Sequence, residues 1–141
     1  MTVWKEPKTV EQLNERGKNT LPEALGMELI EVGDDFLKAT MPVDHRTKQP
    51  LGILHGGASV ALAETLGSIA ANMATDPNSY CVGLEINANH VAKASEGLIT
   101  GITKPVHLGR KTQIWEIKTY RQDGKLNCIS RITMAVLQHN T

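Results

Sequence analysis

One long apolar segment constrains the fold more than any other feature of the sequence. Between Gly56 and Ala74 the chain carries a single charged residue, Glu64. Gly56-Gly57 at the start and Asp76-Pro77 beyond the end are helix boundary signals, and the helix between them is about 27 Å long at 1.5 Å per residue. Because apolar residues occupy its whole circumference, we expect the fold to enclose it. A membrane span is disfavoured because a central charge is costly in lipid.

Runs of strand-forming residues lie on both sides of this helix. Two precede it and four follow it, at residues 27–32, 35–41, 80–90, 98–106, 112–121 and 126–137. Gly33-Asp34 marks a turn between the first two, and Asp123-Gly124 is a strong hairpin signal between the last two. The polar stretch 43–54 is long enough to be a functional loop. Consecutive strands with one long buried helix predict an α+β fold in which an antiparallel sheet curls around that helix.

The N-terminal residues predict a helical lead-in over residues 1–20. Thr9 and Gln12 match a capping box, which predicts a short helix from Val10 toward Arg16, and residues 19–22 are expected to form a loop. The length of 141 residues fits one domain, residues 1–141. The N-terminus lacks the apolar stretch of a signal peptide, so we expect a cytoplasmic location.

The composition narrows the classes of function. The 15 basic and 15 acidic residues give a formal net charge of zero, whereas nucleic-acid-binding domains usually carry a basic excess and membrane-surface anchors carry basic clusters. We therefore expect neither a nucleic-acid nor a membrane partner. Cys81 and Cys128 lie in strand-like apolar runs without metal-type spacing and are interpreted as reduced core thiols. No motif indicates a metal or a cofactor.

Glu64 is the first candidate for catalysis. An isolated carboxylate in an apolar helix resists ionisation, and such groups often serve as a general base or a nucleophile. Ser68 lies one turn further along the same face, where it can orient the carboxylate or a water. The alternative is a structural Glu64 in the core or at the surface end of a stripe, with Ser68 bonded to its own backbone.

The second candidate is the start of the helix, at His55-Gly56-Gly57. Glycine lets a ligand approach the backbone closely, and free N–H groups at a helix N-terminus favour developing negative charge, as an oxyanion hole does. Gln49 and His55 flank the preceding loop and can both donate hydrogen bonds. The alternatives are a flexible turn and an exposed histidine without a role.

Basic residues recur in two later segments, His90-Val91-Ala92-Lys93 and His107-Leu108-Gly109-Arg110-Lys111-Thr112. Basic groups beside a glycine turn suit phosphate binding. The alternative is ordinary solvated charge at the ends of strands.

These features together resemble one known family. The likeness rests on three segments, MPVDHRTKQPLGILHGGASVALAETLGSIA, GLEINANHV and KPVHLGRKTQIW, which are similar to hotdog-fold thioesterases of the 4-hydroxybenzoyl-CoA type. It covers about residues 20–137 and is greatest for the bacterial subgroup that contains 1,4-dihydroxy-2-naphthoyl-CoA hydrolase, of menaquinone synthesis, and the enterobactin proofreading thioesterase. The resemblance implies hydrolysis of an acyl-CoA thioester, preferably aromatic. It also implies a homodimer with shared active sites that pairs into a homotetramer.

The resemblance also implies a role for each candidate residue. Glu64 matches the catalytic carboxylate, and Ser68 matches the hydroxyl near the attacking water. Gln49, His55 and the Gly56 amide match the groups that polarise the thioester carbonyl. The positions that match segments contacting acyl-CoA are Gly83, His90, Val91, Ala92, Lys93, His107, Leu108, Gly109, Arg110, Lys111 and Thr112. The variable acyl pocket matches Ile69, Asn72 and Met73.

Three other functions stay open on the sequence. A proofreading thioesterase would act on an acyl carrier protein in place of CoA, with the same chemistry. A non-catalytic hotdog domain could bind acyl-CoA as a sensor, although a sensor does not need Glu64. A hotdog dehydratase would pair a carboxylate with a catalytic histidine. Within the leading hypothesis, Glu64 can act as a nucleophile or as a general base, because both need the same residue in nearly the same place.

Overall fold

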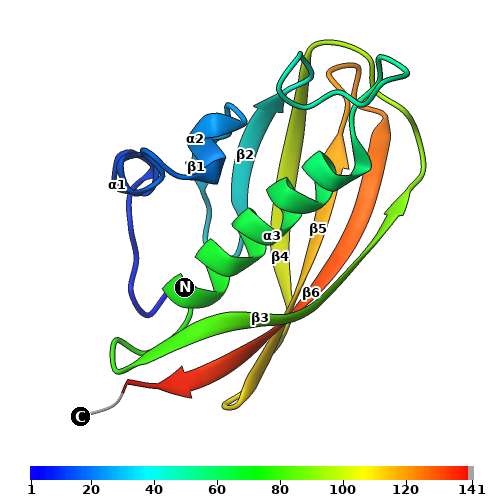
Figure 1. The fold of residues 1–141 in the computed structure, drawn as a ribbon. Helices are drawn as coiled ribbons and strands as arrows, with labels where there is room; N and C mark the ends of the chain where they lie inside the picture. The colour runs from blue at the N-terminus through cyan, green and yellow to red at the C-terminus, as the bar shows by residue number, and fades with distance from the viewer. Residues whose placement is uncertain (140–141) are drawn as a thin grey trace.

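A computed structural model describes residues 1–139; residues 140 and 141, the end of the expected domain, lie outside the described part. Six strands form one antiparallel sheet in the order β1-β2-β4-β5-β6-β3, and this sheet curls around the helix α3 (Figure 1). The main elements are α3 (Gly56–Met73), β1 (Glu28–Val32), β2 (Leu37–Pro42), β3 (Ser79–His90), β4 (Leu98–Leu108), β5 (Thr112–Tyr120) and β6 (Leu126–Gln138). The predicted α+β architecture is confirmed.

The core lies between α3 and the concave face of the sheet. Leu62 and Leu66 of α3 are fully buried, as are Trp115 and Ile132 of the sheet. Each such side chain contributes roughly 1.5–3 kcal/mol by leaving water. Gly67 allows the close approach of α3 to β6, because a Cβ at this position would lie 2.6 Å from the Cγ2 of Ile132.

The N-terminal residues form two short helices, α1 (Val10–Arg16) and α2 (Leu21–Ala24), beside α3 (Figure 1). The predicted capping box is present, with Thr9 and Gln12 exchanging hydrogen bonds of 2.9 and 3.1 Å. The expected loop at residues 19–22 is wrong in its second half, because α2 begins at Leu21 with Pro22 in its first turn. Proline is tolerated there since the first N–H groups of a helix have no partner within the helix.

The predicted strand limits are correct to within two residues. β2 begins at Leu37 and not at residue 35, because the turn closes between the Gly33 N–H and the Phe36 carbonyl, 2.8 Å apart. Cys81 and Cys128 are free and buried, as expected, and burial raises the pKa of both thiols. Within residues 1–139, no helix is long and apolar enough to span a membrane.

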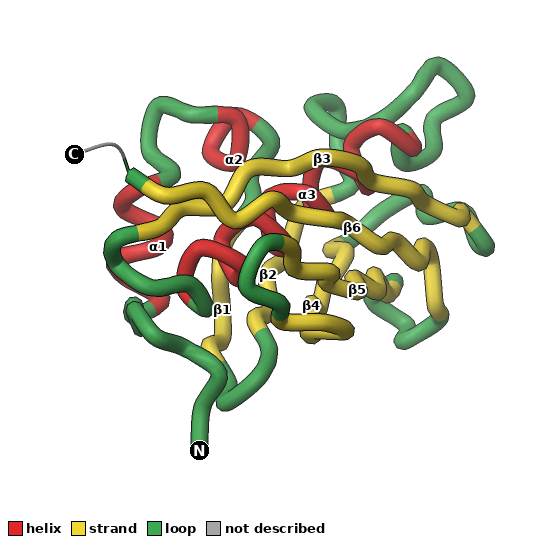
Figure 2. The backbone as a smooth tube through the Cα atoms, turned by 90° about the horizontal axis from the view of Figure 1, so that it is seen from below, coloured by secondary structure: helices red, strands yellow, loops and turns green. Residues whose placement is uncertain are grey.

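The strand β3 forms one edge of the sheet, next to β6 and beside α3 (Figure 2). It carries exposed apolar side chains, with Leu84 62% and Val82 40% exposed. The expected enclosure of α3 is therefore incomplete in the single chain. All 18 residues of α3 are described, and its exposed positions are Gly57 and Glu64.

Candidate active site

His55 caps the start of α3 and fixes the geometry there. Its Nδ1 accepts a hydrogen bond of 2.7 Å from the Gly57 N–H, and its carbonyl accepts from the Ala58 and Ser59 N–H groups. Among the described residues, this leaves the Gly56 N–H without a partner. Because Nδ1 is the acceptor, the proton of the neutral ring is on Nε2. The helix start therefore presents two donors, the Gly56 N–H and the His55 Nε2–H.

Gln49 supplies a third donor on the loop that leads to α3. Its Oε1 accepts from the Leu51 N–H, and its own backbone N–H donates to the Ile53 carbonyl at 2.9 Å. With its oxygen engaged, the half-buried side chain of Gln49 keeps its Nε2 hydrogens free to donate. The sequence hypothesis that Gln49, His55 and Gly56 act on one carbonyl requires three free donors on this loop and helix start, and they are present.

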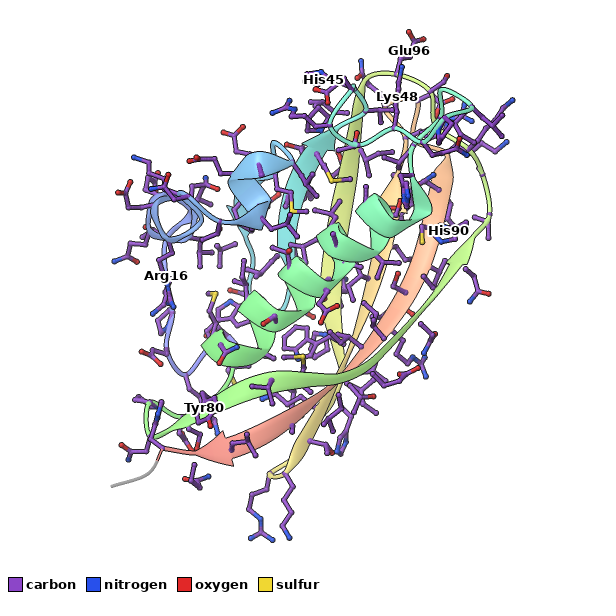
Figure 3. All side chains as sticks on the ribbon, in the orientation of Figure 1. Arg16, His45, Lys48, Tyr80, His90 and Glu96 are labelled. Carbon is purple, nitrogen blue, oxygen red and sulfur yellow. The ribbon has the colours of Figure 1, made fainter. Side chains whose placement is uncertain are left out.

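The ring of His90, at the end of β3, lies against the start of α3 (Figure 3). A Cβ built on Gly56 would be 3.0 Å from the His90 Nε2, which is too close for most side chains. A glycine at this position therefore lets the imidazole of His90 and the backbone of Gly56 share one surface.

Glu64 lies further along α3, over Gly83 of β3. A Cβ built on Gly83 would be 3.1 Å from Oε2 of Glu64. The side chain of Glu64 is exposed in the single chain, so the apolar surroundings expected for it are not supplied by this chain alone. Glu64 therefore has a carboxylate open to the solvent side of α3, above a strand position that has no side chain.

A cavity of about 840 Å³ lies between α3 and the N-terminal residues. Ser68, Ile69, Asn72 and Met73, the candidate residues that follow Glu64 on α3, all line it. Thr65 also lines it, so the lining on α3 begins at the residue directly after Glu64. Two further lining residues, Arg16 and Tyr80, lie near the opposite end of α3 from His90 (Figure 3).

Asn72 lines this cavity but uses its side-chain amide within the protein. Its Nδ2 donates to the carbonyls of Ser68 and Cys81 at 2.8 and 3.3 Å, and its Oδ1 accepts from the Cys81 N–H at 2.9 Å. Asn72 thus joins α3 to β3 at Cys81, which is two residues before Gly83. Of the predicted acyl-pocket residues, Ile69 is the half-buried apolar one with a side chain that can contact a ligand.

The other wall of the cavity was not predicted from the sequence. That wall comes from the residues treated as a lead-in and from β1, and includes Leu13, Met27 and Leu29. Val10 and Leu13, three residues apart, give α1 an apolar face, which is the signal that predicts packing against the rest of the fold. Asn14 fixes α1 in place, since its side chain exchanges two hydrogen bonds of 3.0 and 2.9 Å with the backbone of Leu29.

The single chain does not bring all candidates together. Glu64 is eight residues beyond Gly56, about 12 Å along the helix axis. The segment His107–Thr112 contains the end of β4, the turn and the first residue of β5, at the opposite end of the sheet from the start of α3 (Figure 1). The described residues contain no group of three His, Cys, Asp or Glu side chains that could hold a metal ion.

Comparisons with known proteins show the family of this chain. The model of the thioesterase superfamily matches residues 51–128, which include α3 and strands β3 to β5. The chain is 50% identical to the 1,4-dihydroxy-2-naphthoyl-CoA hydrolase of Escherichia coli, over 96% of this chain and 99% of that protein. It is equally identical to the proofreading thioesterase EntH of Cronobacter turicensis, over 96% and 98%.

The fold has a solved counterpart of similar sequence. A thioesterase from Haemophilus influenzae superposes with a TM-score of 0.95 at 45% identity, covering 97% of this chain and 96% of that one. The sheet curled around one helix is accordingly the hotdog fold. The matched domain and the identities over nearly full length lead to one assignment: this chain belongs to the thioesterase superfamily and is a hotdog-fold thioester hydrolase.

Proposed function

We propose that this enzyme hydrolyses an aromatic acyl-CoA thioester, of the 1,4-dihydroxy-2-naphthoyl-CoA kind, to the free acid and CoA. The observation that carries the proposal is the position of Glu64, a carboxylate exposed above Gly83 and one residue before Thr65, which lines the cavity. The 50% identity to a hydrolase of that CoA thioester supports the acyl group. Glu64 acts as a general base on water or attacks the carbonyl itself.

The chemistry follows from where the donors and the carboxylate lie. The thioester carbonyl accepts hydrogen bonds from the Gly56 N–H and from the side chains of His55 and Gln49. These donors stabilise the negative charge that forms on the oxygen during attack. Glu64 removes the proton of an attacking water, or forms a mixed anhydride that water then cleaves. In both routes the C–S bond breaks and CoA leaves as the thiol after taking up a proton.

The acyl group is proposed to occupy the cavity that Thr65 and Ser68 line on α3. Its volume of about 840 Å³ lies within the usual range of about 300–1,000 Å³ for small-molecule sites. Its lining combines polar and charged side chains with apolar residues from both sides, such as Ile69 on α3 and Leu13 and Met27 opposite. These surfaces suit an aromatic ring system, which gains most of its affinity from apolar contact.

The active enzyme is proposed to be a homodimer with shared sites, which pairs further into a homotetramer. The support is the edge strand β3, whose 12 residues have no neighbour on their outer side in the single chain. An uncovered edge with exposed Leu84 and Val82 favours pairing with another strand. Antiparallel pairing of two copies of β3 about a two-fold axis also lays two α3 helices side by side.

The decisive experiment measures hydrolysis of aromatic acyl-CoA by wild type and by Glu64→Gln. Glutamine keeps the shape but is neither a base nor a nucleophile, so kcat should fall by roughly 10²–10⁴-fold. The exposed position predicts an unchanged thermal midpoint, which separates catalysis from folding. A variant that keeps more than about a tenth of the wild-type kcat, well below that range of effects, would assign Glu64 a structural role.

A second candidate function is proofreading of acyl groups on a carrier protein. The 50% identity to a proofreading thioesterase supports this function as strongly as the equal identity to the CoA-thioester hydrolase supports the first one. The two functions share the phosphopantetheine thioester and differ in what carries it. Parallel kinetics on benzoyl-CoA and on a benzoylated carrier protein distinguish them, because the natural carrier should give the higher kcat/KM.

A further inference from the structure

The segment that follows β3 is fastened on both sides. The Val91 and Ala92 N–H groups donate to the carbonyl of Asn127 at 2.9 and 3.2 Å, and the Ala94 carbonyl accepts from the Leu54 N–H at 2.8 Å. Residues 91–94 thus connect the start of β6 to the residue just before His55. In Figure 3, His45, Lys48 and Glu96 mark the two loops, 43–55 and 91–97, at the end of the molecule where α3 begins.

Asn127 also holds this segment through its side chain. Its Nδ2 donates to the Ala92 carbonyl at 2.5 Å, and its Oδ1 accepts from the Thr119 hydroxyl at 2.9 Å. Both Asn127 and Thr119 are buried, at 4% and 1% exposure. The Thr119 bond orients the amide, because an oxygen that faces the hydroxyl places the nitrogen toward Ala92.

A bulge in β6 explains why the side chain of Asn127 does not follow the regular alternation of the strand. Thr119 pairs with Cys128 and Tyr120 pairs with Leu126, so Asn127 is the extra residue between them. An extra residue at a bulge is released from the ladder and redirects its side chain. Asn127 can therefore direct both its carbonyl and its amide to residues 91 and 92.

The segment held by Asn127 lies next to the helix-start donors that are proposed to act on the thioester. On one side of residues 91–94 lies His90, whose ring rests against Gly56. On the other side, the bond from Ala94 holds Leu54, which precedes His55 and the free Gly56 N–H. One buried residue thereby anchors the segment that contacts the helix start on both sides, in addition to the bond of 2.8 Å from the His55 N–H to the Thr47 carbonyl.

We propose that Asn127, oriented by Thr119, is a positioning residue for thioester hydrolysis. It holds residues 91–94 and, through them, keeps the His55 and Gly56 donors at the distance that the developing oxyanion requires. This inference rests on the proposed function, in which those donors polarise the carbonyl. Asn127 contacts no substrate, so its effect is indirect. A displacement of about 1 Å at a reacting centre is enough to reduce the rate by about 10²-fold.

The test compares Thr119→Val and Asn127→Ala with the matched control Thr103→Val. Thr103 is also buried in the sheet, at 0% exposure, and its hydroxyl donates to the Glu116 carbonyl at 3.0 Å, away from residues 91–94. For benzoyl-CoA, kcat should fall about 10-fold in Thr119→Val and up to about 10²-fold in Asn127→Ala. KM should change little, because an oxyanion contact acts in the transition state. The control should keep its kcat.

Hydrogen exchange provides the second measurement. The amides of Val91, Ala92 and Leu54 should exchange faster in both variants than in wild type and in Thr103→Val, because their anchoring is weakened. Thr119→Val keeps the shape of the side chain, so it carries the test if Asn127→Ala does not fold. Unchanged exchange at Leu54, or a kcat equal to that of the control, overturns the proposal.

Failure of the proposed function and failure of the positioning role of Asn127 give different experimental results. If the proposed function is wrong, wild type and Glu64→Gln will hydrolyse acyl-CoA equally poorly. Exchange at Leu54 still decides whether Asn127 holds the helix start in that case. If wild type is active and Leu54 exchange rises without any loss of kcat, Asn127 holds the loop but has no part in the reaction.

Discussion

The carboxylate of Glu64 faces Gly83 across the gap between α3 and β3, with too little space for most side chains at position 83. A Cβ added to Gly83 would lie 3.1 Å from Oε2 of Glu64. Asn72 maintains this spacing, because its amide bonds to both backbone groups of Cys81, two residues before Gly83. Position 83 therefore determines how much room the carboxylate has.

Adding a side chain at position 83 should displace the carboxylate without unfolding the protein. We expect Gly83→Ala to lower kcat several-fold and Gly83→Val to lower it by about 10²-fold, the cost of a misplacement near 1 Å. The thermal midpoint should hardly change, since Gly83 is exposed on an edge strand. In the Glu64→Gln background the same substitutions should have no further effect, because residues that act through one group are not additive. Equal losses in both backgrounds would show that Gly83 acts elsewhere.

Substitutions of His55 should distinguish its role as a helix cap from its role in catalysis. In His55→Asn, the side-chain oxygen can still accept from the Gly57 N–H, since asparagine is a good N-cap, but the Nε2 donor is lost. We expect a thermal midpoint near that of wild type and a kcat reduced by about 10²–10³-fold, the range for loss of one oxyanion donor. His55→Ala should lose the same activity and also about 0.5–2 kcal/mol of stability. A fully active His55→Asn would leave capping as the only role of this residue.

The sequence predicted the fold well because its strongest signals are local. The apolar run from Gly56 and the Asp123-Gly124 turn are periodic or turn patterns that need no partner to be read. The same holds for the helix-start donors, which lie within a few residues of one another. Their place at the start of the helix could therefore be predicted from the sequence.

The parts that escaped prediction depend on contacts distant in sequence. Asn127 and Thr119 are ordinary polar residues in a strand pattern, and only the bulge and the position of Ala92 give them a common role. The N-terminal wall of the cavity was not predicted for the same reason, since Leu13 and Ile69 line one cavity but are 56 residues apart in the chain. The exposure of Glu64 was also missed, because an apolar helix does not reveal which of its faces stays open to solvent in the single chain.

The turn between β4 and β5 should bind the phosphates of CoA. Arg110 and Lys111 lie on this turn, which the Gly109 N–H closes by donating to the Thr112 carbonyl at 2.9 Å. We expect Arg110→Ala with Lys111→Ala to raise KM for acyl-CoA with little change in kcat, because contacts remote from the carbonyl bind ground and transition states alike. The truncated acyl-pantetheine thioester, which lacks the nucleotide, should be hydrolysed as by wild type. An equal loss on both substrates would indicate a role in folding or assembly.

The active site should require two chains, and the geometry of β3 indicates how they pair. Glu64 is level with Gly83 on β3, whereas Gly56 is level with His90. A Glu side chain cannot span the 12 Å or so between them along one helix, yet the attacking group must lie about 3–3.5 Å from the carbonyl carbon. Antiparallel pairing of two β3 strands, with the two-fold axis between Ile86 and Asn87, sets the partner's His90 opposite Gly83. The start of the partner helix then lies level with Glu64, and this occurs twice in the dimer.

Mixed dimers test this arrangement directly. Glu64→Gln and the double variant Gln49→Ala/His55→Asn are each expected to be nearly inactive. The two proteins are dissociated, mixed in equal amounts and reassembled. Random pairing makes half of the dimers mixed, and each mixed dimer has one intact site of two if one chain supplies Glu64 and the other supplies the donors. The mixture should therefore recover about a quarter of the wild-type activity, as two-fold symmetry requires. If each site lay within a single chain, every site in the mixture would lack one component. An inactive mixture in which native mass spectrometry detects the mixed dimer would accordingly place Glu64, Gln49 and His55 of each site on the same chain.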